Sequence, residues 1–358
     1  MDYDMKDLLE EIIKRGATDL HLTVAAPPMF RKDGRLEPSN YDPLSPEQVK
    51  KLVYSILNDE QKKKFEMTKE LDLSFGVPGL SRFRANVFHQ RGQVACAIRT
   101  IPFKIRSFKQ LGLPPVIAEM ANKQKGLVLV TGPTGCGKST TLAAIIDKID
   151  QERKVHIVTI EDPIEYLFKH KRAIVNQRQI GSDTDKFSTA LKYILRQDPD
   201  VVMIGEMRDR ETMESALNVS ETGHLTLATL HTNSAAESIS RIVDTFPPEK
   251  HSQVRAQISF VIVGIITQNL IPKISGGRAL AVEILYGTPA VKALIRDGRG
   301  HQIYSHLQAG FKYGMVTMNQ SLYKLYMEHQ ISLDNAMTYS RLPKELEEMI
   351  QKKVLILH

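Results

Sequence analysis

The stretch that decides the fold is "LVLVTGPTGCGKSTT", residues 127–141. A short apolar run, typical of a buried strand, leads into a glycine-rich turn, and "TTLAAIIDKI" (140–149) then has the pattern of a helix. Residues 132–139 match G-x-x-x-x-G-K-[ST] in the strand–loop–helix order that a phosphate-binding loop requires. Glycines let backbone N–H groups close around phosphates, and the helix N-terminus adds its positive dipole end. The stretch therefore predicts a nucleoside triphosphate site, because a chance glycine-rich turn would not come with this strand and helix.

The loop supplies the predicted nucleotide-binding residues. Lys138 is expected to reach the β- and γ-phosphates, and Ser139 is expected to ligate Mg²⁺. The predicted set is Gly132, Pro133, Thr134, Gly135, Cys136, Gly137, Lys138, Ser139 and Thr140. A thiol near a helix N-terminus can have a lowered pKa, so redox regulation through Cys136 stays open beside the simpler interpretation that the position needs a small residue.

From about residue 116, short apolar runs alternate with helical stretches. Such runs are typical of strands buried on both faces of a parallel sheet, so we expect a doubly wound α/β core. Ligands of such sheets bind at the carboxyl ends of the strands. The runs "VHIVTI", "DVVMIG" and "LTLATL" end in polar clusters at 161–165, 206–209 and 231–233. Together with the phosphate loop, they predict a catalytic site at one edge of the sheet.

Carboxylates at this edge suit phosphoryl transfer, which depends on positioning and on charge stabilisation. Glu206 follows an apolar strand, where a carboxylate that orients the metal ion belongs. Glu165 can activate or position the attacking water. For Glu161 and Glu165, a charge at a helix N-terminus or a salt bridge is the alternative.

The stretch "GHLTLATLHTN" (223–233) holds two histidines seven residues apart. A strand rises about 3.3 Å per residue, so His224 and His231 would lie roughly 23 Å apart and on opposite faces. They are therefore not expected to share one metal ion. His231 is expected near the γ-phosphate or the attacking water, with strand-end packing as the alternative. His224 is expected at the other end of the strand, in a hinge, in a subunit interface or in simple packing.

The rest of the sequence predicts a two-domain chain. Residues 1–100 combine an amphipathic first helix, a polar helix near 46–65 and short alternating runs, which indicate a small α+β domain with an antiparallel sheet. Residues 101–115 are interpreted as a linker, and 116–358 as the nucleotide-binding domain. Residues 271–358 are predicted to form a helical lobe. Its helices are expected at 289–297, 317–330, 332–340 and 343–353.

Composition excludes several classes of protein. The net charge is +7, but basic and acidic residues are mixed, so no nucleic-acid or membrane surface is required. Two cysteines, Cys96 and Cys136, exclude a four-cysteine zinc site and fit a reduced, cytosolic setting. The longest apolar run, 260–266, is shorter than the about 20 residues of a transmembrane segment, and the acidic N-terminus does not fit a signal peptide.

Four segments together carry a family resemblance. They are the phosphate loop, "TIEDPIEY" (159–166), "LRQDPDVVMIGEMRDRET" (195–212) and "ETGHLTLATLHTNSA" (221–235). They resemble the nucleotide boxes of the secretion ATPase superfamily of type II and type IV systems, and "GATDLHL" (16–22) is similar to its N-terminal signature. By length and motif order, the chain looks like the type IV pilus retraction ATPases, the motors of twitching motility.

The resemblance implies a RecA-like P-loop ATPase core, a PAS-like N-terminal domain, and ATP and Mg²⁺ as cofactors. It also implies a homohexamer in which hydrolysis moves the two domains against each other. Such a ring would be cytoplasmic and peripheral at the inner membrane, docked on a platform protein of the pilus machinery, with no direct contact to nucleic acid.

The resemblance also assigns roles to residues. The second glutamate of "EDPIE", Glu165, would be catalytic, and Glu206 would be the Walker B glutamate and a metal ligand beside Ser139. The remaining assigned residues are the histidine-box His224 and His231 and the phosphate-neutralising Arg84 and Arg99, with Arg82 as a third candidate. A basic strand face is the alternative for these arginines.

The sequence departs from the family pattern in the phosphate loop and in the helix at 290–296. Cys136 stands where the family usually has serine. Retraction ATPases carry an Ala-Ile-Arg-Asn-Leu-Ile-Arg helix, whereas residues 290–296 read Ala-Val-Lys-Ala-Leu-Ile-Arg, with Lys292 and Ala293 at the changed positions. This change favours, as an alternative, an accessory paralogue of the retraction motor.

Three further functions are rivals. A pilus-assembly or secretion ATPase usually has an additional N-terminal domain and a four-cysteine zinc insert, against which the length and the two cysteines argue. A nucleic-acid translocase would show hydrolysis stimulated by DNA or RNA. A regulatory ring without turnover would not need Glu165, Glu206 and His231.

Overall fold

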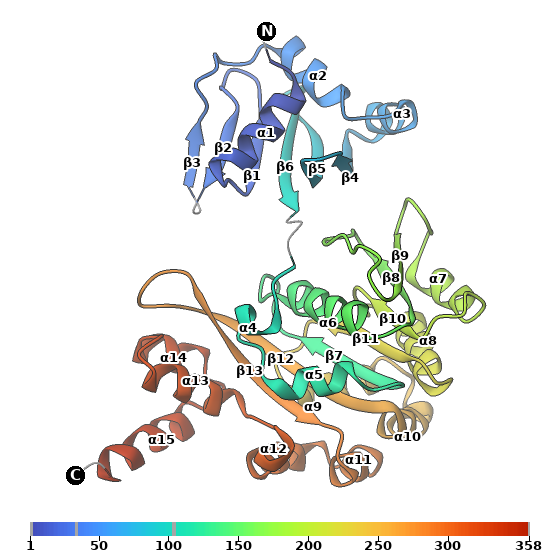
Figure 1. The fold of residues 1–358 in the computed structure, drawn as a ribbon, viewed down its shortest axis with the longest axis vertical. Helices are drawn as coiled ribbons and strands as arrows, with labels where there is room; N and C mark the ends of the chain where they lie inside the picture. Colours follow the sequence, from blue (N-terminus) through green and yellow to red (C-terminus); the bar gives the residue numbers. More distant parts are fainter. Residues whose placement is uncertain (1–2, 33–34, 102–104, 357–358) are drawn as a thin grey trace. The chain divides into compact units, whose positions relative to one another are not determined.

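The structure, a computed structural model, describes residues 3–32, 35–101 and 105–356 (Figure 1). By its internal contacts the chain divides into two compact units. The first consists of residues 1–104 with 165–167, and the second of residues 105–164 with 168–358. Each unit has a hydrophobic core of its own, and each is described separately below.

The first unit is a six-stranded antiparallel sheet with three helices. The strand order is β3-β2-β1-β6-β5-β4. The strands are β1 (Asp19–Leu22), β2 (Met29–Lys32), β3 (Arg35–Pro38), β4 (Glu70–Val77), β5 (Ser81–Gln90) and β6 (Gln93–Ile101). Helix α1 (Met5–Arg15) begins at a capping box on Asp4 and ends at Gly16, whose φ of 64° is left-handed. Its apolar face is buried in the core, as the amphipathic pattern predicts.

The single polar helix predicted near 46–65 is wrong, because two helices occupy this region. Helix α2 (Pro46–Tyr54) begins at Ser45, and α3 (Asp59–Thr68) begins at Asn58. The Asn58 side chain accepts a hydrogen bond from the N–H of Gln61 at 2.8 Å, in a capping box of its own. Such a cap starts a new helix, which the continuous polar composition of the region does not reveal.

The second unit is built on a seven-stranded sheet in the order β13-β12-β7-β11-β10-β8-β9. The four central strands predicted from the apolar runs are confirmed. The strands are β7 (Gly126–Thr131), β8 (His156–Glu161), β9 (Ile174–Gln179), β10 (Val201–Ile204), β11 (Leu225–Leu230), β12 (Ile262–Pro272) and β13 (Arg278–Tyr286). All pairs are parallel except β12–β13. The carboxyl ends of the parallel strands therefore share one edge.

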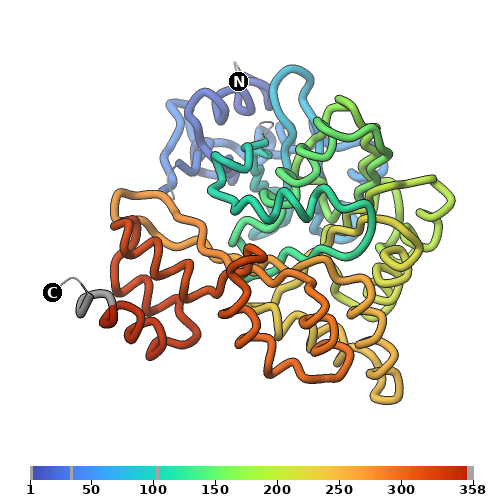
Figure 2. The backbone as a smooth tube through the Cα atoms, turned by 60° about the horizontal axis from the view of Figure 1, so that its bottom comes forward, coloured from blue at the N-terminus to red at the C-terminus, as the bar shows by residue number. Residues whose placement is uncertain are grey.

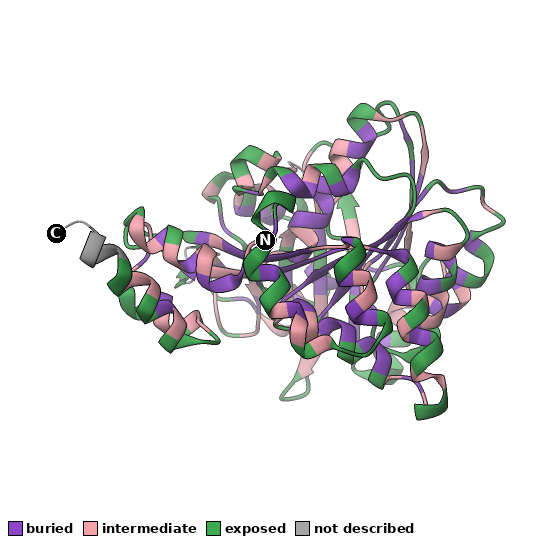
Figure 3. Ribbon diagram, turned by 90° about the horizontal axis from the view of Figure 1, so that it is seen from below, coloured by how far each residue is buried: buried purple, intermediate pink, exposed green. Residues whose placement is uncertain are grey.

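Helices cover both faces of this sheet, which explains the continuous apolar runs (Figure 3). Val128 and Val130 belong to the core formed with α5 (Pro115–Ala121) and α6 (Lys138–Glu152). Leu127 and Leu129 belong to the core on the other face. The helices of that face are α7 (Phe187–Ile194), α8 (Arg210–Glu221), α9 (Ala235–Asp244), α10 (His251–Val261), α11 (Pro289–Arg296) and α12 (Ile303–Ala309).

The prediction that the chain is helical from residue 271 is wrong at its start. Strand β13 pairs with β12 along its whole length, from Gly264↔Tyr286 to Pro272↔Arg278. A short, mostly buried run such as "RALAVEILY" does not reveal its structure by periodicity. The helices beyond α12 are α13 (Met318–Met327), α14 (Leu333–Tyr339) and α15 (Pro343–Ile356), beside the β12–β13 turn (Figure 2).

The predicted linker, 101–115, contains regular structure. Residues 102–104 lie outside the described residues. Phe108–Leu111 forms the short helix α4, which begins at a capping box on Ser107 and ends at Gly112 with a φ of 69°. Pro115 then begins α5, where proline fits because the first helical N–H has no partner within the helix.

Candidate active site

The phosphate loop lies between β7 and α6 in a conformation that only glycine adopts without strain. The φ angles of Gly132, Gly135 and Gly137 are 138°, 78° and 92°. A side chain on Gly132 would bring its Cβ within 2.3 Å of the Gln268 carbonyl oxygen. Gly137 is the N-cap of helix α6, and no side chain caps this end of the helix. Its first N–H groups are therefore oriented for an anionic ligand, and the loop fits the phosphates of a nucleotide.

Lys138 lies across this loop. Its Nζ donates to the carbonyl oxygens of Gly132 at 2.8 Å and Pro133 at 3.1 Å, and it lies 3.4 Å from His231 Nδ1. The ammonium thus links the end of β7 with the end of β11. Ser139 and Thr140 follow on the first turn of α6, both half-buried.

Glu206 joins the ends of β10 and β11. Its Oε1 lies 3.1 Å from His231 Nε2, and its Oε2 lies 2.8 Å from a guanidinium nitrogen of Arg208. Burial by itself raises the pKa of Glu206, but the hydrogen bonds and charges of Arg208 and His231 together lower it. Glu206 is therefore a carboxylate at neutral pH, the form that can orient Mg²⁺ or accept a proton.

Arg208 was not among the site residues predicted from sequence. Its hydrogen bond to Glu206 raises the pKa of its guanidinium. The available signal was its place in the polar cluster 206–209 that follows β10. Its place in this cluster predicted that Arg208 lies near the edge of the sheet, but not that its guanidinium binds Glu206.

The two histidines lie at opposite ends of β11. His231 directly follows the strand and lies between Lys138 and Glu206. His224 directly precedes the strand, and its Nδ1 lies 3.1 Å from the Val219 carbonyl oxygen at the end of α8. Its own carbonyl oxygen accepts from the N–H of Gly126, the first residue of β7. His224 thus joins elements at the edge away from the phosphate loop.

The two glutamates of the "EDPIE" segment differ in environment. Glu161 is buried, and its carboxylate accepts from the Thr159 hydroxyl at 2.6 Å and from the Gln177 amide at 3.0 Å. The bond to Gln177 connects β8 with β9, so Glu161 stabilises the sheet. Glu165 is exposed and lies in the irregular segment after β8. In the division of the chain by contacts, it belongs to the first unit. Its catalytic role stays a prediction.

The predicted phosphate-neutralising arginines share one face of the sheet in the first unit. Arg84 and Arg99 lie directly opposite each other on β5 and β6, and Arg82 lies two residues from Arg84. Arg99 Nε is 2.7 Å from Asp19 Oδ1, whereas Arg84 is 3.9 Å from Asp72. Asp19 thus orients Arg99, and the role of the arginines towards phosphate stays a prediction.

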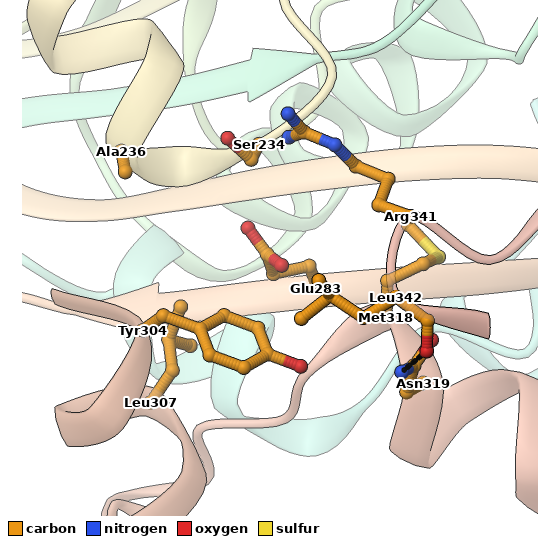
Figure 4. A pocket seen from close by; sticks show the side chains of 9 residues that line it. All are labelled: Ser234, Ala236, Glu283, Tyr304, Leu307, Met318, Asn319, Arg341 and Leu342. Atoms are coloured by element: carbon orange, nitrogen blue, oxygen red, sulfur yellow. Dashed lines mark hydrogen bonds between the residues drawn. The ribbon is translucent and has the colours of Figure 1, made fainter. Parts of the chain in front are cut away.

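A cavity of about 230 Å³ lies beside the start of α9 (Figure 4). The buried Glu283 of β13 accepts from the N–H of Ala235 at 2.8 Å, at the first residue of α9. Burial raises the pKa of Glu283, which the Ala235 bond and the charge of Arg341 oppose. Arg341 itself lies 3.7 Å from Glu237. Glu283, which sequence reasoning missed, therefore fixes the helix that follows His231.

Residues 3–32, 35–101 and 105–356 bear on metal binding and membrane insertion in two ways. There, no three side chains among His, Cys, Asp and Glu gather into a cluster able to hold a metal ion. A Mg²⁺ ion bound with a nucleotide needs few protein ligands, because phosphates and water supply the rest. The assignment of Ser139 and Glu206 as its ligands stays a prediction. None of the helices in the described part of the chain is long and apolar enough to cross a bilayer.

Comparison with protein families matches residues 2–352 to the family described as "Type II/IV secretion system protein". The chain is 47% identical over 341 residues to the "Type IV pilus retractation ATPase PilT" of Pseudomonas aeruginosa, covering 95% of this chain and 99% of that protein. It is also 40% identical over 349 residues to the "Type IV pilus ATPase PilU" of the same organism, covering 97% of this chain and 91% of that protein.

Among solved structures, the chain is similar to the crystal structure of the pilus retraction motor PilT with bound ADP. The TM-score is 0.92 at 51% identity, and the match covers 97% of this chain and 100% of that one. The predicted fold, a RecA-like P-loop ATPase core with a small α+β N-terminal part, is confirmed by this similarity.

Cys136 is buried, and the structure predicts that its thiol reacts slowly. Burial raises the pKa of Cys136, against the lowering effect of Lys138, and burial raises the pKa of Cys96 to about 12. We expect iodoacetamide at about pH 8 to label both thiols more than about tenfold more slowly in the folded protein than in urea, since only the thiolate reacts. Mass spectrometry measures the labelling. Rapid labelling of Cys136 in the folded protein would restore a redox role.

Proposed function

The chain belongs to the type II/IV secretion system protein family, and we propose that it is an ATP-hydrolysing motor that powers retraction of type IV pili. The observation that carries the proposal is the Lys138–His231–Glu206 arrangement at the phosphate loop, in a chain that matches a retraction ATPase over 95% of its length. This arrangement brings a phosphate-binding cation and an ionised carboxylate to one edge of the sheet, as ATP hydrolysis requires.

In the proposed reaction, the loop N–H groups, the start of α6 and Lys138 bind the phosphates of ATP. Lys138 exchanges the carbonyl oxygens of Gly132 and Pro133 for phosphate oxygens. Bound Mg²⁺ would neutralise the developing phosphate charge, with Ser139 and Glu206 as its protein ligands. His231 contacts the γ-phosphate or the attacking water, and Glu165 orients and activates that water.

The coupling of hydrolysis to movement is part of the proposal. The motor is proposed to be a homohexamer in which Arg84 and Arg99 of the N-terminal domain contact the phosphates of ATP, while His224 serves a hinge or a subunit interface. The proposed domains are 1–100 and 116–358. The ring is proposed to act in the cytoplasm, at the inner membrane, through a platform protein of the pilus machinery and without nucleic acid.

An accessory paralogue of the retraction motor is the second candidate. Lys292, which replaces an arginine of the retraction helix, donates to the Phe260 carbonyl oxygen at 3.0 Å. This bond ties α11 to the last turn of α10, so the side chain is engaged within the molecule. The 40% identity to a second pilus ATPase, PilU, also favours this alternative.

Replacement of Glu206 tests hydrolysis. We expect Glu206→Gln to bind ATP within about threefold of the wild-type affinity and to lose turnover by about 100-fold or more, because the amide cannot serve as the metal-orienting carboxylate or as a base. Phosphate release and the affinity for a fluorescent ATP analogue are the measurements. Glu211→Gln, exposed on the first turn of α8, is the matched control. Near-wild-type turnover of Glu206→Gln would remove the role assigned to this residue.

Replacement of the arginines tests their contact with phosphate. We expect Arg84→Ala and Arg99→Ala each to lower turnover by about tenfold or more in the assembled protein, because an arginine that stabilises the transition state contributes a large rate factor. Arg31→Ala is the matched control, since Arg31 also lies beside Asp19, at 3.9 Å. If the steady-state turnover rates of Arg84→Ala and Arg99→Ala equal that of Arg31→Ala, Arg84 and Arg99 only form a basic face of the sheet and do not contact phosphate.

Deletion of the gene distinguishes the cellular roles. A retraction motor predicts hyperpiliated cells that do not twitch, because pili extend and are not withdrawn. Electron microscopy and a surface motility assay provide the readouts, with the Glu206→Gln gene as the inactive complementation control. Bald cells would indicate an assembly ATPase instead, and residual twitching would indicate the accessory paralogue.

A further inference from the structure

We propose that Gln268, a buried residue of β12, is a positioning residue that sets the phosphate loop in its nucleotide-binding conformation. The proposal rests on the proposed ATPase function. Gln268 lies far from the loop in sequence and belongs to no nucleotide motif. It reaches the loop only because β12 pairs in parallel with β7, with Thr267 opposite Thr131.

The Gln268 side chain bridges the loop and the helix that follows it. Its Nε2 donates to the carbonyl oxygen of Cys136 at 2.7 Å, and its Oε1 accepts from the Thr141 hydroxyl at 2.9 Å. The residue is 1% exposed, so both bonds form away from water. One amide therefore fixes the turn of the loop relative to the first turn of α6.

The bond to Cys136 orients an N–H group that would bind phosphate. In a trans peptide, the C=O of one residue and the N–H of the next point in opposite directions. Gln268 holds the Cys136 C=O against β12, so the N–H of Gly137 points the other way. Gly137 is the N-cap of α6, at the end of the helix where an anion is expected.

The loop is also packed tightly on Gln268. A Cβ on Gly132 would lie 2.3 Å from the Gln268 carbonyl oxygen, and a Cβ on Gly137 would lie 3.2 Å from Gln268 Nε2. Two glycines of the phosphate-binding pattern are therefore needed as much for contact with this residue as for their φ angles. A larger residue at Gly132 would collide with Gln268 of β12, and one at Gly137 would crowd it.

Packing by itself does not explain an amide at this position. On β12, Ile265 and Ile266 are fully buried and apolar, whereas Thr267 and Gln268 are buried and polar. A buried amide is unfavourable unless its donor and acceptor are both paired. Both partners of Gln268 lie in the nucleotide-binding element, which points to a role in that element rather than in the core.

The test compares Gln268→Leu with the wild-type protein, with a fluorescent ATP analogue as the ligand. We expect the dissociation constant to rise about tenfold, equivalent to about 1.4 kcal/mol, because the Cys136 carbonyl loses its partner and the loop no longer holds its N–H groups. The kcat at saturating ATP should stay within about threefold, since Gln268 contacts no reacting atom. The KM should rise with the dissociation constant.

Thr267→Val is the matched control. It removes a buried hydroxyl on the neighbouring residue, which is 2.8 Å from the Thr131 hydroxyl, and it leaves the loop contacts of Gln268 in place. Its affinity should stay within about twofold of wild type. A merely structural role for Gln268 would lower the melting temperature of both variants and leave the affinity of both unchanged, and this result would overturn the proposal.

A second variant keeps the proposal testable if Gln268→Leu does not fold. Thr141→Val retains the branched shape and removes only the hydroxyl that holds the amide. It should weaken ATP binding by several-fold, and unchanged affinity would overturn the proposal. Failure of the proposed function would appear differently, as a wild-type protein that does not hydrolyse ATP whatever the affinity of the variants.

Discussion

The rest of the structure depends on one constraint: the phosphate loop has to turn its N–H groups towards an anion while its carbonyl oxygens find partners elsewhere. Lys138 takes the carbonyl oxygens of Gly132 and Pro133, and Gln268 takes that of Cys136. Unpaired buried carbonyl groups would be unfavourable by about 1–3 kcal/mol each. The constraint therefore explains the glycines of the loop and the buried amide of Gln268 on β12.

The parallel sheet turns this loop into a site. Because β7, β10 and β11 run in one direction, their carboxyl ends bring Lys138, Glu206 and His231 together, and each of these residues is held by another strand end. The same geometry places His224 at the other end of β11, away from the phosphate loop. Cys136 shows a balance of opposing effects. The helix N-terminus and Lys138 favour its thiolate, but burial disfavours it more, so the thiol pKa rises.

The hairpin β12–β13 connects the nucleotide loops with the C-terminal helices. Gln268 on β12 holds the phosphate loop, and Glu283 on β13 holds the start of α9 after His231. Val282 N–H donates to the Ser321 hydroxyl of α13 at 3.0 Å. Strand β13, which holds the start of α9, therefore also contacts α13.

The sequence by itself determined whatever depends on neighbouring residues. The phosphate loop, the central strands and the placement of Glu206 and His231 at strand ends follow from local patterns, because periodicity and motif spacing act over a few residues. The tertiary structure decided the pairings between distant segments. Arg99 pairs with Asp19, and Arg208 and His231 both contact the carboxylate of Glu206. Gln268 binds the phosphate loop through the Cys136 carbonyl oxygen. Residues 278–286 form strand β13, which pairs with β12, and not a helix. Local sequence could not decide them, because strand order and register bring these groups together, and a buried apolar run fits a strand and a helix equally well.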